Sequence, residues 1–191
     1  MTAYPRPQQQ KSFLRDLLEI FLLAIVLYII INFAVQTVHV MGQSMEPTLQ
    51  DNDFLIASKV SYRLHDPQRG DIVIFKPNNG EEHDYIKRII ALPGETVAVR
   101  DSKVYVNGQL LAEPYIADPP HYTYPYAGGE FVVPEGTVFV MGDNRNNSSD
   151  SHIFGPVPLD NVIGKAFFSY LPLRDAGLIP HERYAKAQAG Q

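Results

Sequence analysis

The sequence contains no cysteine, and this single absence excludes several kinds of chemistry. Without a thiol the chain cannot form a disulfide, a thiolate metal site, an iron–sulfur cluster or a cysteine nucleophile. Cysteine usage also indicates no compartment, because a chain without thiols is compatible with reducing and oxidising surroundings alike.

Positive charge is in short supply as well. Lys and Arg total 16 against 21 Asp and Glu, so the formal net charge is −5. A chain with this balance lacks a broad basic surface for a polyanion, and nucleic acid is therefore not an expected partner. The 191 residues, 45% of them hydrophobic, are enough for one domain with a buried core.

Charge is missing altogether from residues 20–38. About 19 residues at roughly 1.5 Å per residue match a hydrocarbon core of about 30 Å, so this stretch predicts a transmembrane helix. Arg6, Lys11 and Arg15 precede it and Lys59 is the first basic residue after it, which places the N-terminus in the cytoplasm. A cleavable signal peptide is the alternative, but its apolar region is usually shorter and ends at a small-x-small site.

Short apolar or alternating runs separated by turn residues make up the rest of the chain. Because no strand–helix–strand alternation occurs, we predict a mainly β fold of antiparallel sheets. The Pro- and Tyr-rich segment 114–129 indicates a surface excursion, and the tail is expected to be peripheral, with a short helix at 182–188. The predicted strands are 54–58, 71–75, 85–92, 96–100, 103–106, 130–133, 137–141 and 162–170.

A first candidate for chemistry is Ser44, which follows the apolar span closely. A serine between Gly42 and Pro47 lies on irregular backbone, where main-chain N–H groups can point at an oxyanion. An ordinary turn serine is the alternative, and no G-x-S-x-G nucleophile elbow is present.

A second candidate is Lys87, in the strand predicted at 85–92. With a period of two it shares a face with Tyr85 and Ile89, which is an apolar setting. A lysine held there loses hydration, its pKa falls, and it can act as a neutral general base. The alternative is a lysine that extends to solvent at a sheet edge.

A third candidate is the polar run 141–156, which directly follows an apolar strand. Many short hydrogen-bonding side chains in one place can hold a loop rigid and turn hydroxyls inward. The alternatives are a solvated loop and a calcium loop, although the acidic residues are sparse and the EF-hand pattern is absent.

Taken together with the N-terminal span, four ordered motifs closely resemble those of the type I signal peptidases. The resemblance implies a serine–lysine endopeptidase that removes signal peptides from exported preproteins at a lipid bilayer, with an antiparallel β-sheet catalytic domain. It implies no metal and no organic cofactor, and it leaves the oligomeric state open. The motifs are G-x-S-M-E-P-T-L from Gly42, R-G-D-I-V-I-F from Arg69, Y-I-K-R-I-I-A-L-P-G-E from Tyr85 and G-D-N-R-N-N-S-S-D-S-H-I-F-G-P from Gly142.

The resemblance also implies a role for each matched residue. The family often has Ser or Thr two residues before the nucleophile, but this position is Gly42 here, so main-chain N–H groups of Gly42 and Ser44 are expected to bind the oxyanion. The implied roles are Ser44 as nucleophile, Lys87 as general base, Ser148 as the hydroxyl that orients the lysine, Asp150 as acidic support of that loop, and Asp143, Asn144 and Arg145 as a structural motif.

Two rival interpretations remain. One rival is a serine hydrolase that uses His152 as its general base. In the family this position is commonly arginine, and a histidine here is a form associated with cyanobacterial and thylakoid members. The other is a non-catalytic, membrane-tethered β-domain that binds extended peptides. Histidines outside the motifs are His39, His65, His83, His121 and His181.

The expected organisation follows from the span and the resemblance. The membrane is expected to be a bacterial plasma membrane, with the thylakoid membrane as the alternative. The expected parts are a cytoplasmic segment at 1–19, an anchor helix at 20–38, an extracytoplasmic β-rich peptidase domain at 39–175 and a tail at 176–191.

Overall fold

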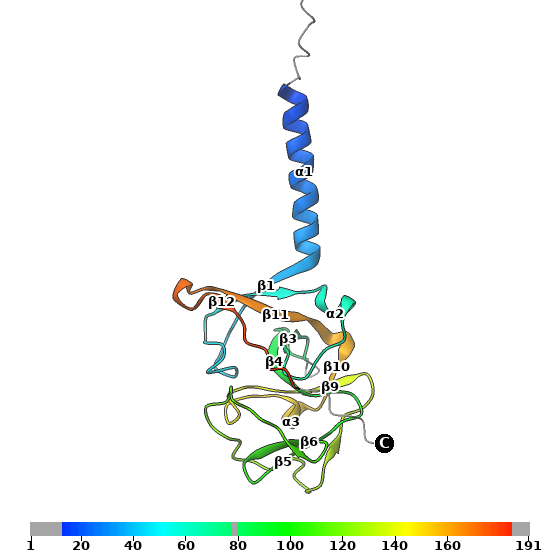
Figure 1. Ribbon diagram of the computed structural model, residues 1–191, viewed down its shortest axis with the longest axis vertical. Coiled ribbons are helices and arrows are strands. Elements are labelled where there is room, and N and C mark those ends of the chain that lie inside the picture. Colours follow the sequence, from blue (N-terminus) through cyan, green and yellow to red (C-terminus); the bar gives the residue numbers. More distant parts are fainter. Residues whose placement is uncertain (1–12, 78–79, 185–191) are drawn as a thin grey trace, which may run out of the picture. The chain divides into compact units, whose positions relative to one another are not determined.

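The computed structural model describes residues 13–77 and 80–184, which form two units that meet between Ala34 and Val35 (Figure 1). The first unit is the helix α1 (Phe13–Ala34), 22 residues long, with no buried side chain. Its length and apolar composition suffice to cross a membrane.

The bounds of α1 differ from those of the predicted helix at both ends. It begins at Phe13 rather than at residue 20, because charged residues do not end a helix. Arg15 and Glu19 lie one helical turn apart and form an ion pair on its surface. It ends at Ala34 rather than at residue 38. The β-branched residues after Ala34 instead form β1 (Val35–His39), which pairs with β2 (Phe54–Ser58).

The second unit is built on an eight-stranded sheet in which every neighbouring pair is antiparallel. The strand order is β1-β2-β11-β3-β4-β9-β10, with β12 paired to β11. All four residues of β3 are buried because this strand lies inside the sheet and is covered on both faces. The remaining bounds are β3 (Ile72–Phe75), β4 (Tyr85–Ala91), β9 (Thr137–Met141), β10 (Val157–Pro158), β11 (Val162–Leu171) and β12 (Gly177–Leu178).

A smaller four-stranded sheet has the order β7-β6-β5-β8. Val97 and Val104 of this sheet share a buried cluster with Ile90 and Phe139 of the large sheet, so one core joins the two sheets. The small-sheet strands are β5 (Thr96–Arg100), β6 (Lys103–Val106), β7 (Gln109–Leu110) and β8 (Phe131–Val132). Short helical turns complete the unit: α2 (Ser61–Leu64), α3 (Ser151–Phe154), η1 (Leu159–Asn161) and η2 (Leu173–Asp175).

The mainly β, antiparallel fold is confirmed. Each predicted strand corresponds to an observed one within a residue or two, whereas β1 and the two-residue strands β7, β10 and β12 were not predicted. Such short strands carry too few residues for an alternation pattern. Within the predicted helix 182–188, residues 182–184 are not helical and the others lie outside the described residues.

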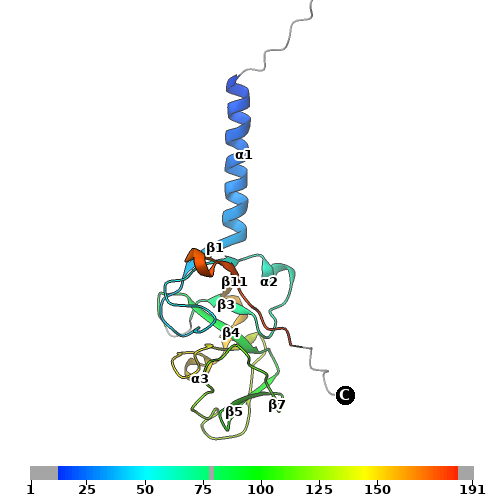
Figure 2. The same ribbon diagram turned by 60° about the vertical axis from the view of Figure 1, so that its left-hand side comes forward.

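The prediction of a peripheral tail is wrong for its described part. The segment after β12 runs back across the body in both views (Figures 1 and 2). Ile179 is buried in the core beneath the large sheet. Farther along, the hydroxyl of Tyr184 donates to the carbonyl of Ala112, 2.7 Å away. That hydroxyl also lies 3.3 Å from the hydroxyl of Tyr115, so the tail connects the large sheet to the start of the Pro- and Tyr-rich excursion.

Candidate active site

Ser44 lies in the turn that follows β1. The turn is anchored from below by Met45 and Leu49, both almost fully buried, and the N–H of Leu49 donates to the carbonyl of Met45. Gly42 has φ +89°, in the left-handed region that favours glycine. A buried foundation and a glycine bend thus hold the half-buried Ser44 in place.

Lys87 reaches Ser44 from β4. Its side chain is 5% exposed rather than extended into solvent. Nζ lies 2.7 Å from Ser44 Oγ and donates to the carbonyl of Ile86 at 2.9 Å. The Tyr85 ring lies on the same side, with its centroid 5.3 Å from Nζ. The structure therefore brings together two candidates that are 43 positions apart in the sequence.

Burial changes the chemistry of this amine. Loss of hydration lowers the pKa of Lys87 from 10.5 to about 8, because an ammonium ion is poorly stabilised away from water. The carboxylates of Asp150 and Asp143 act in the opposite direction and limit the decrease. Near pH 8 a large fraction of Lys87 is therefore neutral and able to accept a proton.

Asp143 is the centre of a buried ion pair with Arg88, the residue after Lys87. Arg88 Nε donates to Oδ1 at 2.8 Å and Nη2 donates to Oδ2 at 2.6 Å, with both side chains fully buried. The hydroxyl of Thr48 donates to the same carboxylate. One carboxylate therefore connects β4, the Ser44 turn and the polar loop after β9.

Asn144 holds the Ser44 turn directly. Its main-chain N–H donates to the carbonyl of Ser44 at 3.1 Å, and its side-chain amide donates to the carbonyl of Gln43, also at 3.1 Å. Arg145 points the other way, where it forms a buried ion pair with Glu113 and donates to the carbonyl of Gly142. The motif expected to be structural thus contacts the Ser44 turn on one side and Glu113, just before the excursion, on the other.

Ser148 lies beside Gly142. Its Oγ is shielded from solvent and has no hydrogen-bond partner among the residues that the structure describes. A Cβ at Gly142 would collide with this Oγ and with the carbonyl oxygen of Ser44, so only glycine fits between the two serines. A hydrogen bond from Ser148 to Lys87 is not observed and stays a prediction.

Asp150 is fully buried and supports the same loop. Its Oδ2 accepts the N–H of Gly142 at 2.9 Å, and its Oδ1 lies 2.6 Å from Nδ1 of His152. The His152 ring stacks on Tyr122 with centroids 4.2 Å apart. In the described part of the chain, Ser44 Oγ has no hydrogen bond to a histidine, and the partner it has is Lys87.

The two expected oxyanion donors differ in their surroundings. The N–H of Gly42 donates to Oδ1 of Asp51 at 2.7 Å and is therefore engaged. The N–H of Ser44 makes no hydrogen bond within the described residues. Only the N–H of Ser44 can donate to a new acceptor without breaking a hydrogen bond.

A groove of about 310 Å³ opens beside Ser44 and Lys87. It runs between β1 and the start of β4, so an extended peptide could lie along it. The polar residues His39, His83 and Asp84 also line it. Its apolar walls come from Val38, Val40, Ile74 and Ile86.

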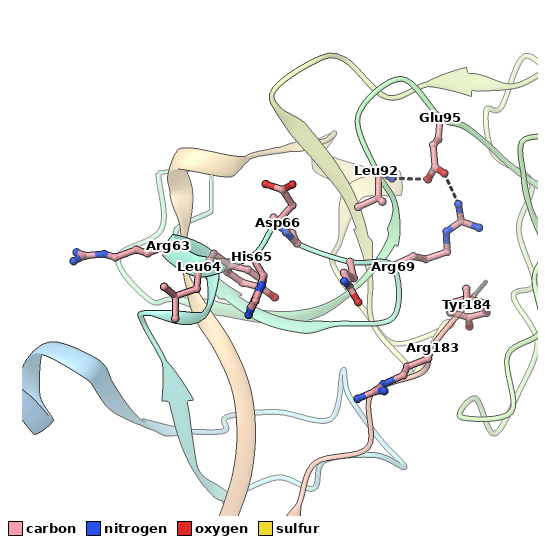
Figure 3. A pocket seen from close by; sticks show the side chains of 12 residues that line it. Arg63, Leu64, His65, Asp66, Arg69, Leu92, Glu95, Arg183 and Tyr184 are labelled. Carbon is pink, nitrogen blue, oxygen red and sulfur yellow. Dashed lines mark hydrogen bonds and ion pairs between the residues drawn. The ribbon is translucent and has the colours of Figure 1, made fainter. Parts of the chain in front are cut away.

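A second cavity, of about 790 Å³, shares no residue with this groove (Figure 3). One wall is closed by Glu95, which pairs with Arg69 and accepts the N–H of Leu92. Arg63 and Arg69 point in opposite directions in Figure 3, so the basic side chains do not converge on one point. The candidate serine and lysine lie elsewhere.

Several residues of the site were not anticipated from the sequence. Arg88 and Thr48 hold Asp143, and Glu113 neutralises Arg145. The available signal was Arg88 itself: it lies in an apolar strand, and a buried arginine needs a buried acid. The partner of Arg88 could not be identified because it lies 55 positions away in the sequence.

Comparison with known proteins gives a consistent picture. The family model described as "Signal peptidase, peptidase S26" matches residues 14–171. A "Probable signal peptidase I-2" of Synechocystis sp. is 47% identical over 161 residues, which cover 82% of this chain and 72% of that protein. A "Probable signal peptidase I-1" of the same organism is 44% identical, with coverages of 88% and 86%. A "Probable thylakoidal processing peptidase 2, chloroplastic" of Arabidopsis thaliana is 44% identical, with coverages of 76% and 41%.

Proposed function

Because this chain belongs to the signal peptidase family, peptidase S26, we propose that it removes N-terminal signal peptides from exported preproteins with Ser44 as nucleophile and Lys87 as general base. Membership makes it a serine endopeptidase of the signal peptidase type. The observation that carries the assignment of residues is the 2.7 Å separation of Lys87 Nζ and Ser44 Oγ in a buried setting.

The first half of the reaction forms an acyl-enzyme. Neutral Lys87 accepts the Ser44 hydroxyl proton while Oγ attacks the carbonyl carbon of the scissile peptide bond. The resulting ammonium group then donates that proton to the leaving amine as the carbon–nitrogen bond breaks. The mature protein departs with a new N-terminus, and the signal peptide remains as an ester on Ser44.

The second half releases the signal peptide. Lys87, neutral again, removes a proton from water, and the hydroxide attacks the ester carbonyl. The proton returns to Ser44 Oγ, which restores the starting state. One lysine therefore serves as base and acid in both halves, in the way that histidine does in serine–histidine peptidases.

We assign the oxyanion to the main-chain N–H of Ser44, which makes no hydrogen bond among the described residues. A preorganised donor of this kind stabilises the charge that develops in the transition state. Ser148 is assigned as the hydroxyl that orients Lys87. Its Oγ is buried and has no hydrogen-bond partner among the described residues. This supports the assignment, because a buried hydroxyl normally has a partner and this one is free to bond Lys87 in another state of the site.

The substrate is proposed to bind as an extended strand in the groove between β1 and β4. Shallow apolar pockets would then accept small residues at the first and third positions before the cut, a preference implied by the family. A preprotein whose residues at these positions are changed to large ones should not be cleaved.

We propose that α1 is retained as a membrane anchor, with the N-terminal segment in the cytoplasm and the β-rich body on the other side. Its end at Ala34 is followed within ten residues by Ser44, so the nucleophile stays near the membrane along the chain. A cyanobacterial plasma or thylakoid membrane is supported by the relatives from Synechocystis and Arabidopsis.

The test is cleavage of a preprotein by the full chain in detergent micelles, with the products identified by mass spectrometry. We expect wild type to cut after a small residue, and Ser44→Ala and Lys87→Ala to lose more than a thousandfold in rate. Matched controls are Ser102→Ala, in the turn between β5 and β6, and Lys103→Ala, at the start of β6; both residues are exposed and both variants should cleave normally.

The same experiment separates the rivals. Activity that survives in Lys87→Ala but disappears in His152→Ala would assign the base to His152. Wild type that binds the preprotein without cutting it would support the non-catalytic binding domain. The geometry favours Lys87, because Ser44 Oγ lies 2.7 Å from Lys87 Nζ and, among the described residues, has no hydrogen bond to His152.

A further inference from the structure

Asn144 contacts the two peptide units on either side of the Cα of Ser44. Its side-chain amide donates to the carbonyl of Gln43 at 3.1 Å, and its main-chain N–H donates to the carbonyl of Ser44, also at 3.1 Å. One residue therefore restrains the backbone both before and after the candidate nucleophile.

The bond to Gln43 also determines where the N–H of Ser44 points. This N–H and the carbonyl of Gln43 belong to one peptide unit, which is planar and trans. In a trans unit the two groups point in opposite directions, so a carbonyl held toward Asn144 fixes the N–H pointing away from it. A hydrogen bond to the carbonyl also polarises the unit, which strengthens the N–H as a donor.

The backbone of Asn144 is a rigid base for this contact. Its two neighbours, Asp143 and Arg145, are buried, and each is paired with an oppositely charged side chain. The carbonyl of Asn144 accepts the N–H of Asn147 at 3.1 Å. The side-chain amide thus projects from a fixed loop, as a group that must hold a donor in place without reorganisation requires.

We propose that Asn144 is a positioning residue for the reaction: its side-chain amide orients the N–H of Ser44 toward the oxyanion that forms when Ser44 Oγ attacks the scissile carbonyl. This inference rests on the proposed roles of the Ser44 hydroxyl and N–H. Asn144 does not line the substrate groove and acts only through the peptide unit of Gln43 and Ser44. The N–H of Gly42 cannot replace the Ser44 donor without losing its bond to Asp51.

A substitution at position 144 separates the two contacts of this residue. Loss of the side chain removes the bond to Gln43, whereas the main-chain N–H still donates to the carbonyl of Ser44. The 2.7 Å contact between Ser44 Oγ and Lys87 Nζ involves neither group. A variant should therefore keep nucleophile and base together while the peptide unit that carries the oxyanion donor becomes free to rotate.

The experiment measures kcat and KM for cleavage of a preprotein by the full chain in detergent micelles, as wild type, Asn144→Ala and Asn144→Asp. Aspartate has the shape of asparagine, but its carboxylate cannot donate a hydrogen bond. We expect kcat to fall about tenfold in both variants and KM to change less than about twofold, because an oxyanion donor acts in the transition state rather than on bound substrate.

The matched controls are Asn147→Ala and Asn147→Asp. They remove the same amide, or add the same charge, at an exposed position of the same loop. Both should keep kcat within about twofold of wild type, which separates loss of the Gln43 bond from a general effect of altering this loop.

A peptide aldehyde that ends at the cut site tests the oxyanion directly. Ser44 Oγ adds to the aldehyde carbon, the carbon–oxygen double bond becomes single, and the serine proton passes to Lys87, so the former carbonyl oxygen takes the oxyanion position. The matching peptide alcohol has no carbonyl there and forms no such adduct. Asn144→Ala should weaken binding of the aldehyde about tenfold and binding of the alcohol less than about twofold.

A merely structural role would give a different pattern. Equal weakening of aldehyde and alcohol, or equal kcat values for Asn144→Ala and Asn147→Ala, would overturn the inference. So would a shifted midpoint in the pH profile of kcat/KM, because it would mean that Ser44 had moved away from Lys87.

Two further features keep the outcome interpretable. If Asn144→Ala fails to fold, as far-UV circular dichroism will report, Asn144→Asp fills the same space and carries the same comparison with its Asn147 control. Failure of the proposed function is distinguishable, since wild type would then not cleave the preprotein or Lys87→Ala would keep its activity, whatever the Asn144 variants do.

Discussion

The buried amine of Lys87 should make the folded chain less stable than it would be with an apolar side chain. The native state lowers the pKa of Lys87 from 10.5 to about 8. Each pKa unit corresponds to about 1.4 kcal/mol, so keeping this ammonium in the native state at pH 7 costs about 3 kcal/mol. Replacing Lys87 with methionine, of similar length and no charge, removes that cost.

The variant also loses two hydrogen bonds. Lys87 Nζ contacts Ser44 Oγ and the carbonyl of Ile86, and each such bond contributes about 1 kcal/mol net. At pH 7 we therefore expect Lys87→Met to be about 1–2 kcal/mol more stable than wild type while being inactive.

The effect should depend on pH in a defined direction. Between pH 8 and 10.5 the unfolded chain holds a proton on Lys87 that the native state has released, so wild type becomes more stable as pH rises. The advantage of Lys87→Met should shrink by about 2–3 kcal/mol from pH 7 to pH 10 and change sign. This change is independent of the two lost hydrogen bonds.

The assay is guanidinium unfolding of the full chain in detergent micelles, followed by far-UV circular dichroism at several pH values. Lys103→Met, which alters an exposed lysine of β6, is the control and should stay within about 0.5 kcal/mol of wild type at every pH. A difference between Lys87→Met and wild type that is the same at pH 7 and pH 10 would refute the reasoning.

Three further predictions concern the same site. The rate constant kcat/KM should rise about tenfold from pH 7 to pH 9, because the neutral fraction of Lys87 rises from about one tenth to about nine tenths. A kcat/KM that falls over this range would exclude a lysine base. Gly142→Ala should lower kcat more than tenfold, because the added Cβ would collide with Ser148 Oγ and the Ser44 carbonyl oxygen. Gly177→Ala, whose added Cβ would have no atom within 4 Å, should leave kcat unchanged, and equal rates for the two variants would contradict the crowding at Gly142. Asp143→Asn should destabilise the chain by about 3 kcal/mol, because it leaves Arg88 buried without its charge partner. A lower Tm will report this loss, and Asp160→Asn, which alters an exposed aspartate, is the control.

Much of this protein was readable from local sequence patterns. The strands at 54–58, 96–100, 103–106 and 137–141 have the predicted bounds, because alternation and turn residues act over a few neighbours. The family was likewise identified from the sequence, and the match over residues 14–171 confirms it. An uncharged stretch near the N-terminus was sufficient to predict one long apolar helix.

Other features needed the tertiary structure, since they depend on partners far away in the chain. The end of α1 at Ala34 is set by pairing of β1 with β2, and the engagement of Gly42 depends on Asp51. The tail is not peripheral because Tyr184 reaches Ala112. None of these contacts leaves a periodic trace in the sequence.

The sequence by itself thus determined which residue types were available for chemistry: a serine on an irregular turn, a lysine in an apolar strand and a polar loop. Only the tertiary structure decided that Ser44 and Lys87 meet at 2.7 Å and that water is excluded around the amine. Burial is a property of everything packed around a side chain rather than of its neighbours in the chain, and burial is what lowers the pKa of this lysine.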